Sequence, residues 1–258
     1  MSTILFNEII FGPVHSRRLG TSLGVNLLPR FGKWCSFDCL YCECGFNKDG
    51  KEDNRLPTVD EVKVALESTL RDYTKNTGKI DTITFSGNGE PTMHPDFAEI
   101  IDFALEMRAK YCPEAKVSVL SNASQIHKPA VAAALLRTDN PILKIDSAIE
   151  ETTQIIDRPQ FLYSLKSLKK NLEPFRNKFV LQTMFLRGEF EGKAIDNTTE
   201  TEVNEWRKLV TDIEPREIMV YTIDRETPAA NLQKVSVEEM EKITAPLKEL
   251  GYRISISG

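Results

Sequence analysis

Long apolar stretches are missing from this sequence of 258 residues. No run approaches the roughly 18 hydrophobic residues that a membrane-spanning helix needs, and residues 1–8 lack the architecture of a signal peptide. We therefore expect a cytoplasmic protein that makes no membrane contact. Internal repeats and low-complexity linkers are absent as well, and a hydrophobic content of 41% can fill one large core. The length and composition fit one large domain or two small ones, and we expect a single domain over residues 1–258.

Cysteine is scarce, and an excess of positive charge is absent. The chain has five cysteines, four of them in its first fifth, and none follows residue 112. This placement favours a reducing compartment and a metal over a disulfide framework, and it argues against an auxiliary cluster held by a C-terminal cysteine module. The 38 acidic and 33 basic residues give a net charge of −5, so the chain as a whole does not attract nucleic acid or anionic membranes.

Three of these cysteines lie close together in one segment. Cys35, Cys39 and Cys42 are separated by three and then two residues, so one loop could present three thiolates to a compact iron-sulfur cluster. An electron-carrying cluster is usually closed by four cysteines. Three ligands would leave one coordination position open, as in catalytic zinc sites, and this favours a cluster that binds a small molecule.

Three other interpretations of these cysteines remain open. Cys44, or His15 in its place, could complete a zinc site, although four sulfurs within ten residues differ from the two separated pairs typical of zinc folds. Cys44 could equally close an electron-carrying cluster. The cysteines could also be buried core thiols, but the neighbouring residues Lys33, Asp38 and Glu43 do not indicate an apolar core.

The segment from Cys35 to Cys42 resembles the radical S-adenosylmethionine (radical SAM) enzymes, whose motif is Cys-x-x-x-Cys-x-aromatic-Cys. Tyr41 supplies the aromatic residue. In that family the three cysteines bind a four-iron four-sulfur cluster, whose unique iron chelates the amino and carboxylate groups of SAM. The reduced cluster cleaves SAM to a 5′-deoxyadenosyl radical. The resemblance implies that Cys35, Cys39 and Cys42 are the iron ligands and that Tyr41 lies at the cofactor. It does not identify a catalytic residue.

Strand-like and helix-like segments alternate along the chain, which is typical of a parallel α/β fold. Thr58 and Glu61 have the spacing of a capping box at the start of a helix that ends at Gly78. The six or seven steps are too few for a closed eight-fold barrel, and radical SAM enzymes commonly have a partial (β/α)6 TIM-like barrel, which we expect here. The expected strands are residues 23–28, 80–85, 117–120, 142–145, 179–185, 217–222 and 252–256, and the other helices are residues 96–110, 128–136, 161–172, 200–211 and 237–250.

A glycine-rich motif, Ser86-Gly87-Asn88-Gly89-Glu90-Pro91, follows the second expected strand. It resembles the Gly-Gly-Glu-Pro motif of the family, which receives the amino group of SAM, and so implies SAM contacts for Gly89, Glu90 and Pro91. Asn88 departs from the motif, but asparagine tolerates left-handed backbone geometry, so the turn could be kept. A plain turn before a helix is the alternative interpretation.

Polar residues at the ends of further strands are candidate SAM or substrate contacts, since active sites of parallel barrels lie at that end. Lys144 and Asp146 share one face of a strand and could instead form a buried ion pair. For each of these residues, a purely structural role is an equal alternative. The candidates are Ser121, Asn122, Lys144, Asp146 and Gln182.

Residues 12–20 and 221–228 resemble a subgroup related to the enzymes that form the tRNA base wyosine. Arg17, Arg18 and Arg225 in these segments are enough for one small anion but too few for a duplex, and residues 188–196 at the expected rim are net negative. We therefore expect a small-molecule or peptide substrate rather than nucleic acid, with a flavodoxin- or ferredoxin-like protein as reductant. A glycyl-radical-enzyme activase, a tRNA-modifying enzyme and a non-catalytic iron-sulfur protein remain alternatives.

Overall fold

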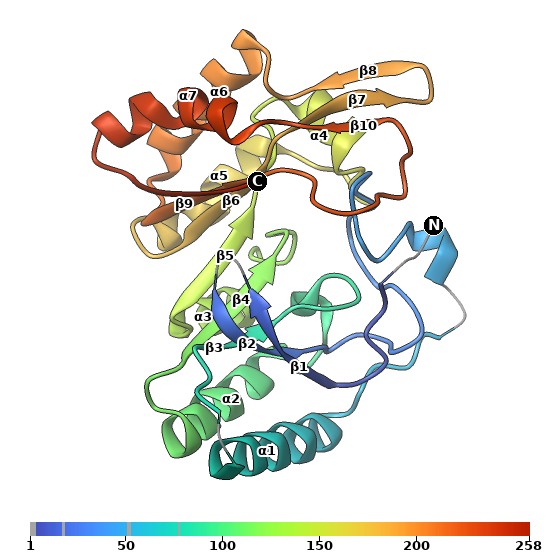
Figure 1. The fold of residues 1–258 in the computed structure, drawn as a ribbon, viewed down its shortest axis with the longest axis vertical. Coiled ribbons are helices and arrows are strands. Elements are labelled where there is room, and N and C mark those ends of the chain that lie inside the picture. The colour runs from blue at the N-terminus through green and yellow to red at the C-terminus, as the bar shows by residue number, and fades with distance from the viewer. Residues whose placement is uncertain (1–3, 17–18, 51–52, 77) are drawn as a thin grey trace. The chain divides into compact units, whose positions relative to one another are not determined.

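The computed structural model describes residues 4–16, 19–50, 53–76 and 78–258. These residues form two compact units (Figure 1). The first unit comprises Leu5–Cys35 and Asn47–Ile142, and the second comprises Ile4, Ser36–Phe46 and Leu143–Gly258. The chain passes from one unit to the other after Ile4, after Cys35 within the cysteine segment, after Phe46, and after Ile142 within one strand. The single domain expected over residues 1–258 stays a prediction.

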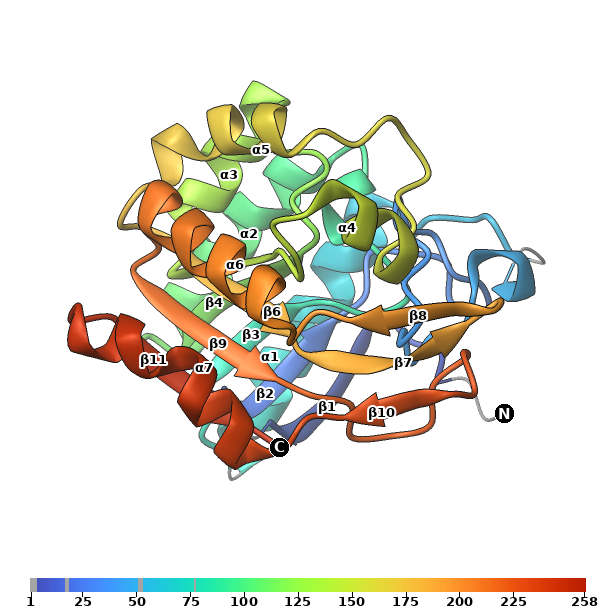
Figure 2. The same ribbon diagram turned by 90° about the horizontal axis from the view of Figure 1, so that it is seen from above.

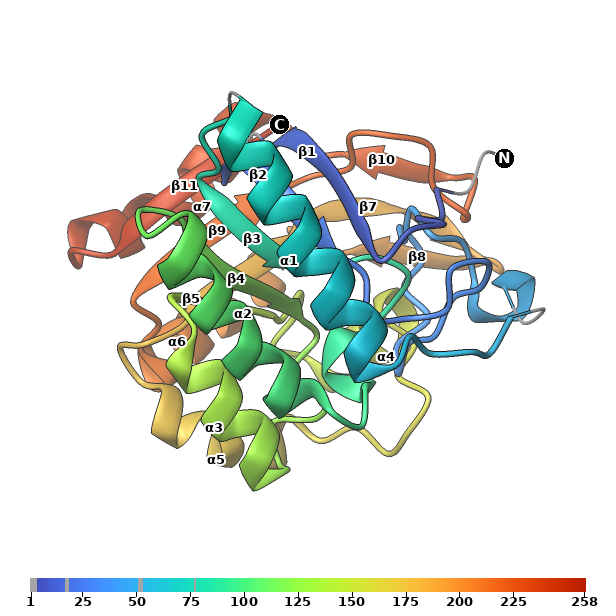
Figure 3. The same ribbon diagram turned by 90° about the horizontal axis from the view of Figure 1, so that it is seen from below.

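The first unit is a sheet with three helices packed side by side on one face (Figure 3). Its strands lie in the order β1-β2-β3-β4; β2, β3 and β4 are parallel, and β1 is antiparallel to β2. The elements are β1 (Ile10–Ser16), β2 (Gly20–Val25), the 3-10 turn η1 (Asn47–Gly50), α1 (Val59–Asn76), β3 (Thr82–Phe85), the 3-10 turn η2 (Pro91–Met93), α2 (Phe97–Tyr111), β4 (Lys116–Ser121), α3 (Pro129–Arg137) and the start of β5 (Asn140–Lys144).

The two faces of this sheet differ in chemistry. Phe85 points toward the helices and packs edge-on against an aromatic ring of α2. The opposite face carries buried hydroxyl groups: Ser22 Oγ donates to Thr84 Oγ1 at 2.8 Å, and Thr82 Oγ1 lies 2.9 Å from Ser118 Oγ. Parallel strands covered on both faces are usually apolar throughout. Here the hydroxyl groups bond to one another, which allows a polar face to be buried without unsatisfied groups.

The predicted capping box at the start of α1 is confirmed. Thr58 N donates to Glu61 Oε2 at 2.8 Å, and Glu61 N donates to Thr58 Oγ1 at 3.2 Å. Each side chain thus satisfies a backbone N–H that has no partner within the helix. Val62, Leu66 and Leu70 of the same helix are fully buried, as their spacing along one face predicts.

The second unit contains a parallel set of strands in the order β6-β9-β11, with α7 packed along β11 (Figure 2). Thr199 and Ser236 cap two of its helices by accepting a backbone N–H three residues on. The elements are the end of β5, α4 (Glu150–Ile156), α5 (Leu165–Leu172), the 3-10 turn η3 (Glu173–Phe175), β6 (Val180–Met184), α6 (Glu200–Ile213), β9 (Glu217–Tyr221), α7 (Val237–Glu249) and β11 (Arg253–Ser257).

A small antiparallel sheet, in the order β10-β7-β8, belongs to the same unit. Its strands are β7 (Leu186–Phe190), β8 (Lys193–Asp196) and β10 (Leu232–Lys234). Glu191 and Gly192, both at positive φ, form the two-residue turn between β7 and β8, which matches the preference of such hairpins for left-handed residues.

The expected alternation of strands and helices is confirmed, but four features were missed. The sequence reasoning overlooked β1, α4, the β7–β8 hairpin and β10. The first expected strand, residues 23–28, lies earlier in the structure, at Gly20–Val25, and the helix expected from residue 161 begins at Leu165. The missed elements are short, and the hairpin lies in the segment 188–196 that we had expected only as a rim. Within the described ranges, no helix combines the length and apolar character needed to cross a membrane.

Candidate functional site

The loop after β3 holds the start of the cysteine segment through Gly89. Trp34 N donates to Asn88 O at 2.9 Å, and Glu90 N donates to Trp34 O at 3.1 Å. These bonds form a short parallel bridge between Trp34 and Gly89. Gly89 has a φ of +137°, and a Cβ at this position would lie 1.9 Å from Trp34 O and 3.1 Å from Cys35 N. Only glycine allows the two loops to approach this closely.

Asn88, which replaces a glycine of the motif, is a buried centre of hydrogen bonds. Its Nδ2 donates to Phe6 O at 2.9 Å and to Pro29 O at 2.8 Å, and its Oδ1 accepts from Phe6 N at 2.8 Å. Asn26 Oδ1 accepts the backbone N–H groups of Asn88 and Leu28, each at 3.2 Å. Left-handed geometry is not what keeps Asn88 in the motif, since its φ is negative. Its amide instead ties the motif to two distant backbone segments.

Glu90 is 2% exposed and accepts hydrogen bonds from both neighbouring loops. Its Oε1 accepts from Ser121 Oγ at 2.8 Å, from Thr92 N at 3.1 Å and from the Thr92 hydroxyl, and its Oε2 accepts from Asn122 N at 2.6 Å. Burial raises the pKa of Glu90, and the hydrogen bonds from Thr92, Asn122 and Ser121 offset part of that rise. The structure thus brings together the predicted residues Glu90, Ser121 and Asn122, with Pro91 buried at the start of η2.

Asn122 also reaches the first cysteine. Its Nδ2 lies 3.6 Å from Cys35 Sγ, at hydrogen-bond distance for sulfur. An amide that donates to a sulfur stabilises the thiolate and tunes a cluster that the sulfur binds. In the first unit, the glycine-rich motif and the end of β4 therefore meet at Cys35.

The second unit holds the middle of the cysteine segment by backbone pairing. Gln160 N donates to Ser36 O at 2.8 Å, Asp38 N to Asp157 O at 3.0 Å, and Leu40 N to Ile156 O at 2.9 Å. Residues 36–40 therefore run antiparallel to residues 156–160, which begin at the last residue of α4. Beyond this pairing, Cys42 N donates to Cys39 O at 3.2 Å and Gly45 N to Cys42 O at 2.9 Å, so consecutive turns carry the last two cysteines of the motif.

Lys144 lies between two buried carboxylates at the end of β5. Its Nζ is 2.9 Å from Asp146 Oδ2 and 2.5 Å from Asp157 Oδ1. The Tyr41 hydroxyl donates to Asp146, and Lys144 Nζ lies 5.5 Å from the centre of the Tyr41 ring. The ion pair between Lys144 and Asp146 that the sequence left open is therefore present. Asp157 belongs to the same network and was not foreseen.

The pKa values in this network follow from burial and charge. Burial lowers the pKa of Lys144, but Asp146 and Asp157 more than compensate, so the pKa stays well above its usual value and the ammonium is retained. Burial and the neighbouring Asp146 raise the pKa of Asp157, while Lys144 lowers it. Burial, with Asp146, also raises the pKa of Tyr41 well above 10, which keeps its hydroxyl protonated as a donor.

Gln182, the last predicted contact, lies in β6 and is 5% exposed. Its backbone O accepts from Ile145 N at 3.0 Å, whereas its side-chain amide forms no hydrogen bond with any residue in the described ranges. Its neighbour Thr183 points to the helical face, where its hydroxyl accepts from Trp206 of α6 at 3.0 Å. Gln182 therefore points to the opposite face of the strand, as alternation requires.

A family model described as the radical SAM superfamily matches residues 30–197, which is more than half of the chain. The chain belongs to the radical SAM superfamily. Curated relatives include a protein named GTPase Obg of Brachyspira hyodysenteriae, 31% identical over 90% of this chain, and a UPF0026 protein of Methanocaldococcus jannaschii, 27% identical over 94%. The chain spans 32% of the length of the first and 72% of the second.

Solved structures of the superfamily have a similar fold. A radical SAM methyltransferase from Sphaerobacter thermophilus superposes with a TM-score of 0.67 at 13% identity, covering 91% of this chain and 65% of that chain. A protein described as anSMEcpe with bound AdoMet gives a TM-score of 0.60 at 17% identity, covering 91% and 63%. These similarities confirm the predicted α/β fold of the radical SAM type.

Membership of the superfamily implies a four-iron four-sulfur cluster and SAM, and the donor set of this radical SAM protein fits them. Cys35, Cys39 and Cys42 are not in disulfides; Cys39 is buried and the other two are partly exposed. At most three residues separate neighbouring cysteines, which limits their Cα spacing to about 14 Å. The assignment of these three as iron ligands stays a prediction, as does the role of Cys44, which is not in a disulfide either.

Of the three arginines expected near the site, Arg225 lies in the part of the chain that the structure describes. Arg225 forms an exposed ion pair with Glu43, at 2.6 Å. Arg17 and Arg18 lie outside the described residues. A small anion at Arg225 would therefore compete with the carboxylate of Glu43.

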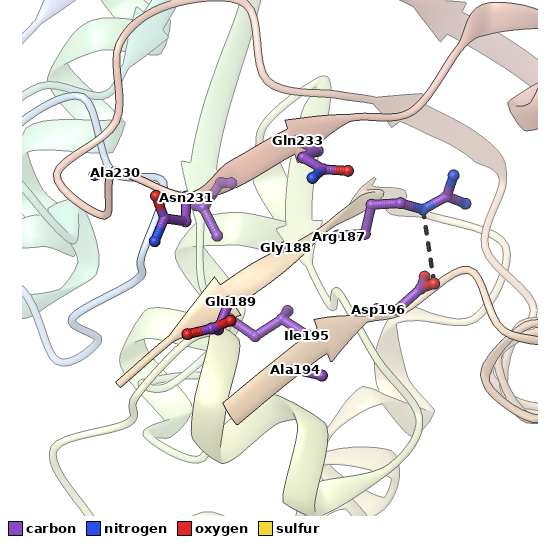
Figure 4. A pocket seen from close by; sticks show the side chains of 10 residues that line it. Arg187, Gly188, Glu189, Ala194, Ile195, Asp196, Ala230, Asn231 and Gln233 are labelled. Carbon is purple, nitrogen blue, oxygen red and sulfur yellow. Dashed lines mark ion pairs between the residues drawn. The ribbon is translucent and has the colours of Figure 1, made fainter. Parts of the chain in front are cut away.

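The open face of the β10-β7-β8 sheet is a polar groove (Figure 4). In this view Arg187 points toward Asp196, at 3.6 Å, and Glu189 lies farther along β7. Arg187 also donates to Glu239 and Thr198. The cation of the groove is thus already paired, and the surrounding carboxylates make this face unsuited to an anionic ligand.

Sequence reasoning missed Asp157 and Arg158, which follow α4. The polar pair Asp157-Arg158 directly after the apolar pair Ile155-Ile156 was the available signal. Nothing in the sequence indicates that this segment pairs with residues 36–40, because α4 was not expected and the pairing joins positions more than one hundred residues apart.

Proposed function

We propose that this protein is a radical SAM enzyme that binds a four-iron four-sulfur cluster through Cys35, Cys39 and Cys42. The chemistry such a cluster supplies is reductive cleavage of SAM to a 5′-deoxyadenosyl radical, which abstracts hydrogen from a substrate. The observation that carries the proposal is the three-cysteine motif, whose cysteines form no disulfide and whose backbone is held by hydrogen bonds on both sides of Cys35. Its match to the superfamily supports the same chemistry.

The residues of the chain have separate tasks in this proposal. Gly89 and Asn88 hold the loop beside Cys35, and Asn122 donates toward its sulfur. Glu90 offers a buried carboxylate whose Oε2 accepts a single protein donor, so this oxygen retains capacity for the ammonium group of SAM. Gln182 presents a side-chain amide, without a hydrogen-bond partner among the described residues, on the face of β6 opposite the helix. Lys144 and Asp146 form an ion pair, and Asp146 also accepts a hydrogen bond from the Tyr41 hydroxyl. We therefore assign these two residues to holding Tyr41 in place rather than to contact with SAM.

The test is anaerobic incubation of the reconstituted, reduced protein with SAM, followed by measurement of 5′-deoxyadenosine. We expect its formation in the wild type and in the Cys112→Ala variant, and none in Cys39→Ala. A protein that binds the cluster but forms no 5′-deoxyadenosine would contradict the proposal and favour a non-catalytic iron-sulfur protein.

The partners remain part of the proposal. We infer a flavodoxin- or ferredoxin-like reductant, because cleavage of SAM requires one electron, and a small-molecule or peptide substrate. The acidic total charge and the paired state of Arg187 and Arg225 support this choice over tRNA. Titration with bulk tRNA at low and physiological salt checks it: submicromolar binding with a steep salt dependence would favour a tRNA-modifying enzyme instead.

A further inference from the structure

Arg158 lies beside two neighbouring aromatic rings and close in space to the cysteine segment. Its guanidinium carbon is 5.1 Å from the centre of the Phe46 ring and 5.2 Å from that of Phe190. Phe46 follows the cysteines in sequence, and Phe190 ends strand β7. The centres of the two rings lie only 6.2 Å apart, so both rings contact the guanidinium from neighbouring directions rather than from opposite faces. Cation–π attraction to both rings holds the group in place and leaves the rest of it for other partners.

No residue in the described ranges accepts a hydrogen bond from this guanidinium. The nearest carboxylate oxygen is Asp38 Oδ2, 3.6 Å from Arg158 Nη2, which is beyond hydrogen-bond distance. The side chain is 33% exposed, so solvent reaches it. A guanidinium has five N–H donors, and a carboxylate or phosphate group matches two of them at once.

Other arginines of the same unit are engaged differently. Arg176 donates to Glu214 at 2.6 Å, Arg225 to Glu43 at 2.6 Å, and Arg207 to the backbone O of Ile243 at 2.9 Å. Each of these has an acceptor within the protein. Arg158 instead contacts two aromatic rings and forms a 3.6 Å ion pair with Asp38, and its N–H groups donate to no acceptor among the described residues.

The backbone at Arg158 is also strained. Its φ is +48°, in the left-handed region, where glycine or asparagine would fit at lower cost. Arg158 N donates to Thr153 O at 3.2 Å, and Arg158 O accepts from Asp38 N at 3.2 Å. The surrounding backbone thus enforces this conformation. An arginine kept where the backbone favours glycine points to a use of its side chain.

We propose that Arg158 binds an anionic oxygen group of the substrate, a carboxylate or a phosphate, and so determines specificity for a small anionic molecule or peptide. This inference rests on the proposed function. The two rings exclude water from one side of the guanidinium, which strengthens a charge-assisted hydrogen bond from its remaining N–H groups. Asp38 offsets part of the positive charge, so the site suits one anionic group rather than a polyanion.

The test measures the thermal midpoint of the full-length, cluster-reconstituted protein in chloride, acetate and inorganic phosphate at equal ionic strength. The variants are Arg158→Lys, which keeps the charge, and Arg158→Met, which keeps much of the contact with the rings. Arg176→Met is the matched control. A ligand that binds only the folded protein raises the midpoint in a saturable manner, and the more effective of acetate and phosphate identifies the anion class.

We expect a saturable rise in the wild type and in Arg176→Met, a rise that needs about tenfold more anion in Arg158→Met, and an intermediate result in Arg158→Lys. An equal rise in wild type and Arg158→Met, or no saturable rise in wild type, overturns the proposal. The same preparations are assayed for 5′-deoxyadenosine. Formation of 5′-deoxyadenosine without Arg158-dependent anion binding overturns only this inference. Arg158-dependent anion binding without formation of 5′-deoxyadenosine overturns the proposed function, and with it the conclusion that the bound anion belongs to the substrate of such an enzyme.

Discussion

The two units hold the cysteine segment by different physical means. In the first unit, the loop at Gly89 fits closely against Trp34 and Cys35, and the one buried acid there, Glu90, is surrounded by neutral hydrogen-bond donors. In the second unit, the segment 156–160 that pairs with residues 36–40 contains Asp157. Asp157 belongs to a charged network in which Lys144 lies between two carboxylates. The first arrangement depends on shape and the second on charge.

This difference predicts which side chains can be replaced singly without a large loss of stability. Neutral donors share the stabilisation of Glu90, so the loss of one leaves the others in place. Lys144 is the cation that faces both Asp146 and Asp157, so its loss leaves two buried carboxylates close together. Four predictions test this contrast, beginning with the largest expected effect.

The cysteine variants test the proposed set of iron ligands. Replacement of Cys35, Cys39 or Cys42 by alanine should each remove the cluster, because three ligands are needed to hold it. Cys44→Ala should retain it. Iron and sulfide analysis with the absorption spectrum of the reconstituted protein measures this. Retention of the cluster in Cys35→Ala together with its loss in Cys44→Ala would show that Cys44, and not Cys35, is a ligand.

Lys144→Met should lower the free energy of unfolding by about 3–5 kcal/mol, because it leaves buried carboxylates without a counter-charge. Lys208→Met is the control: Lys208 forms an exposed pair with Glu205, at 2.6 Å, and its loss should cost below about 1 kcal/mol. Denaturant unfolding of the two variants provides the comparison. Equal losses would mean that charge does not dominate the second unit.

Gly89→Ala should lower the free energy of unfolding by about 3 kcal/mol, because the backbone conformation is strained for alanine and its Cβ meets Trp34 O. Gly251→Ala separates the two causes: Gly251 also has a positive φ, +92°, but no atom within 4 Å of the added Cβ. That control should lose about 1 kcal/mol. If both variants lose the same amount, backbone strain alone accounts for the effect, and close approach contributes nothing.

Glu90→Gln should have the smallest effect on stability, a loss of about 1–2 kcal/mol, because one amide N–H₂ would face a donor that Glu90 now satisfies. Iron content should not change. The affinity for SAM should fall by about tenfold or more in Glu90→Ala, since the ammonium would lose a charged acceptor. Calorimetric titration of iron-replete protein checks this, and an unchanged dissociation constant would assign Glu90 to structural support alone.

The sequence by itself determined the features that depend on local spacing. The cysteine motif, the capping box at Thr58 and Glu61, and the polar residues that end apolar strands could all be identified because each is written within a few residues. The alternation of strands and helices, and with it the fold class, followed from the same short-range periodicity.

Only the tertiary structure decided what depends on distant partners. The sequence could not show that Asn88 binds Phe6 and Pro29, or that residues 156–160 pair with the cysteine segment. It could not show that Arg158 lacks an acceptor among the described residues. Hydrogen bonds and ion pairs form wherever the fold brings donors and acceptors within about 3 Å. Composition and spacing therefore specify which groups are available, and chain topology alone specifies which of them meet.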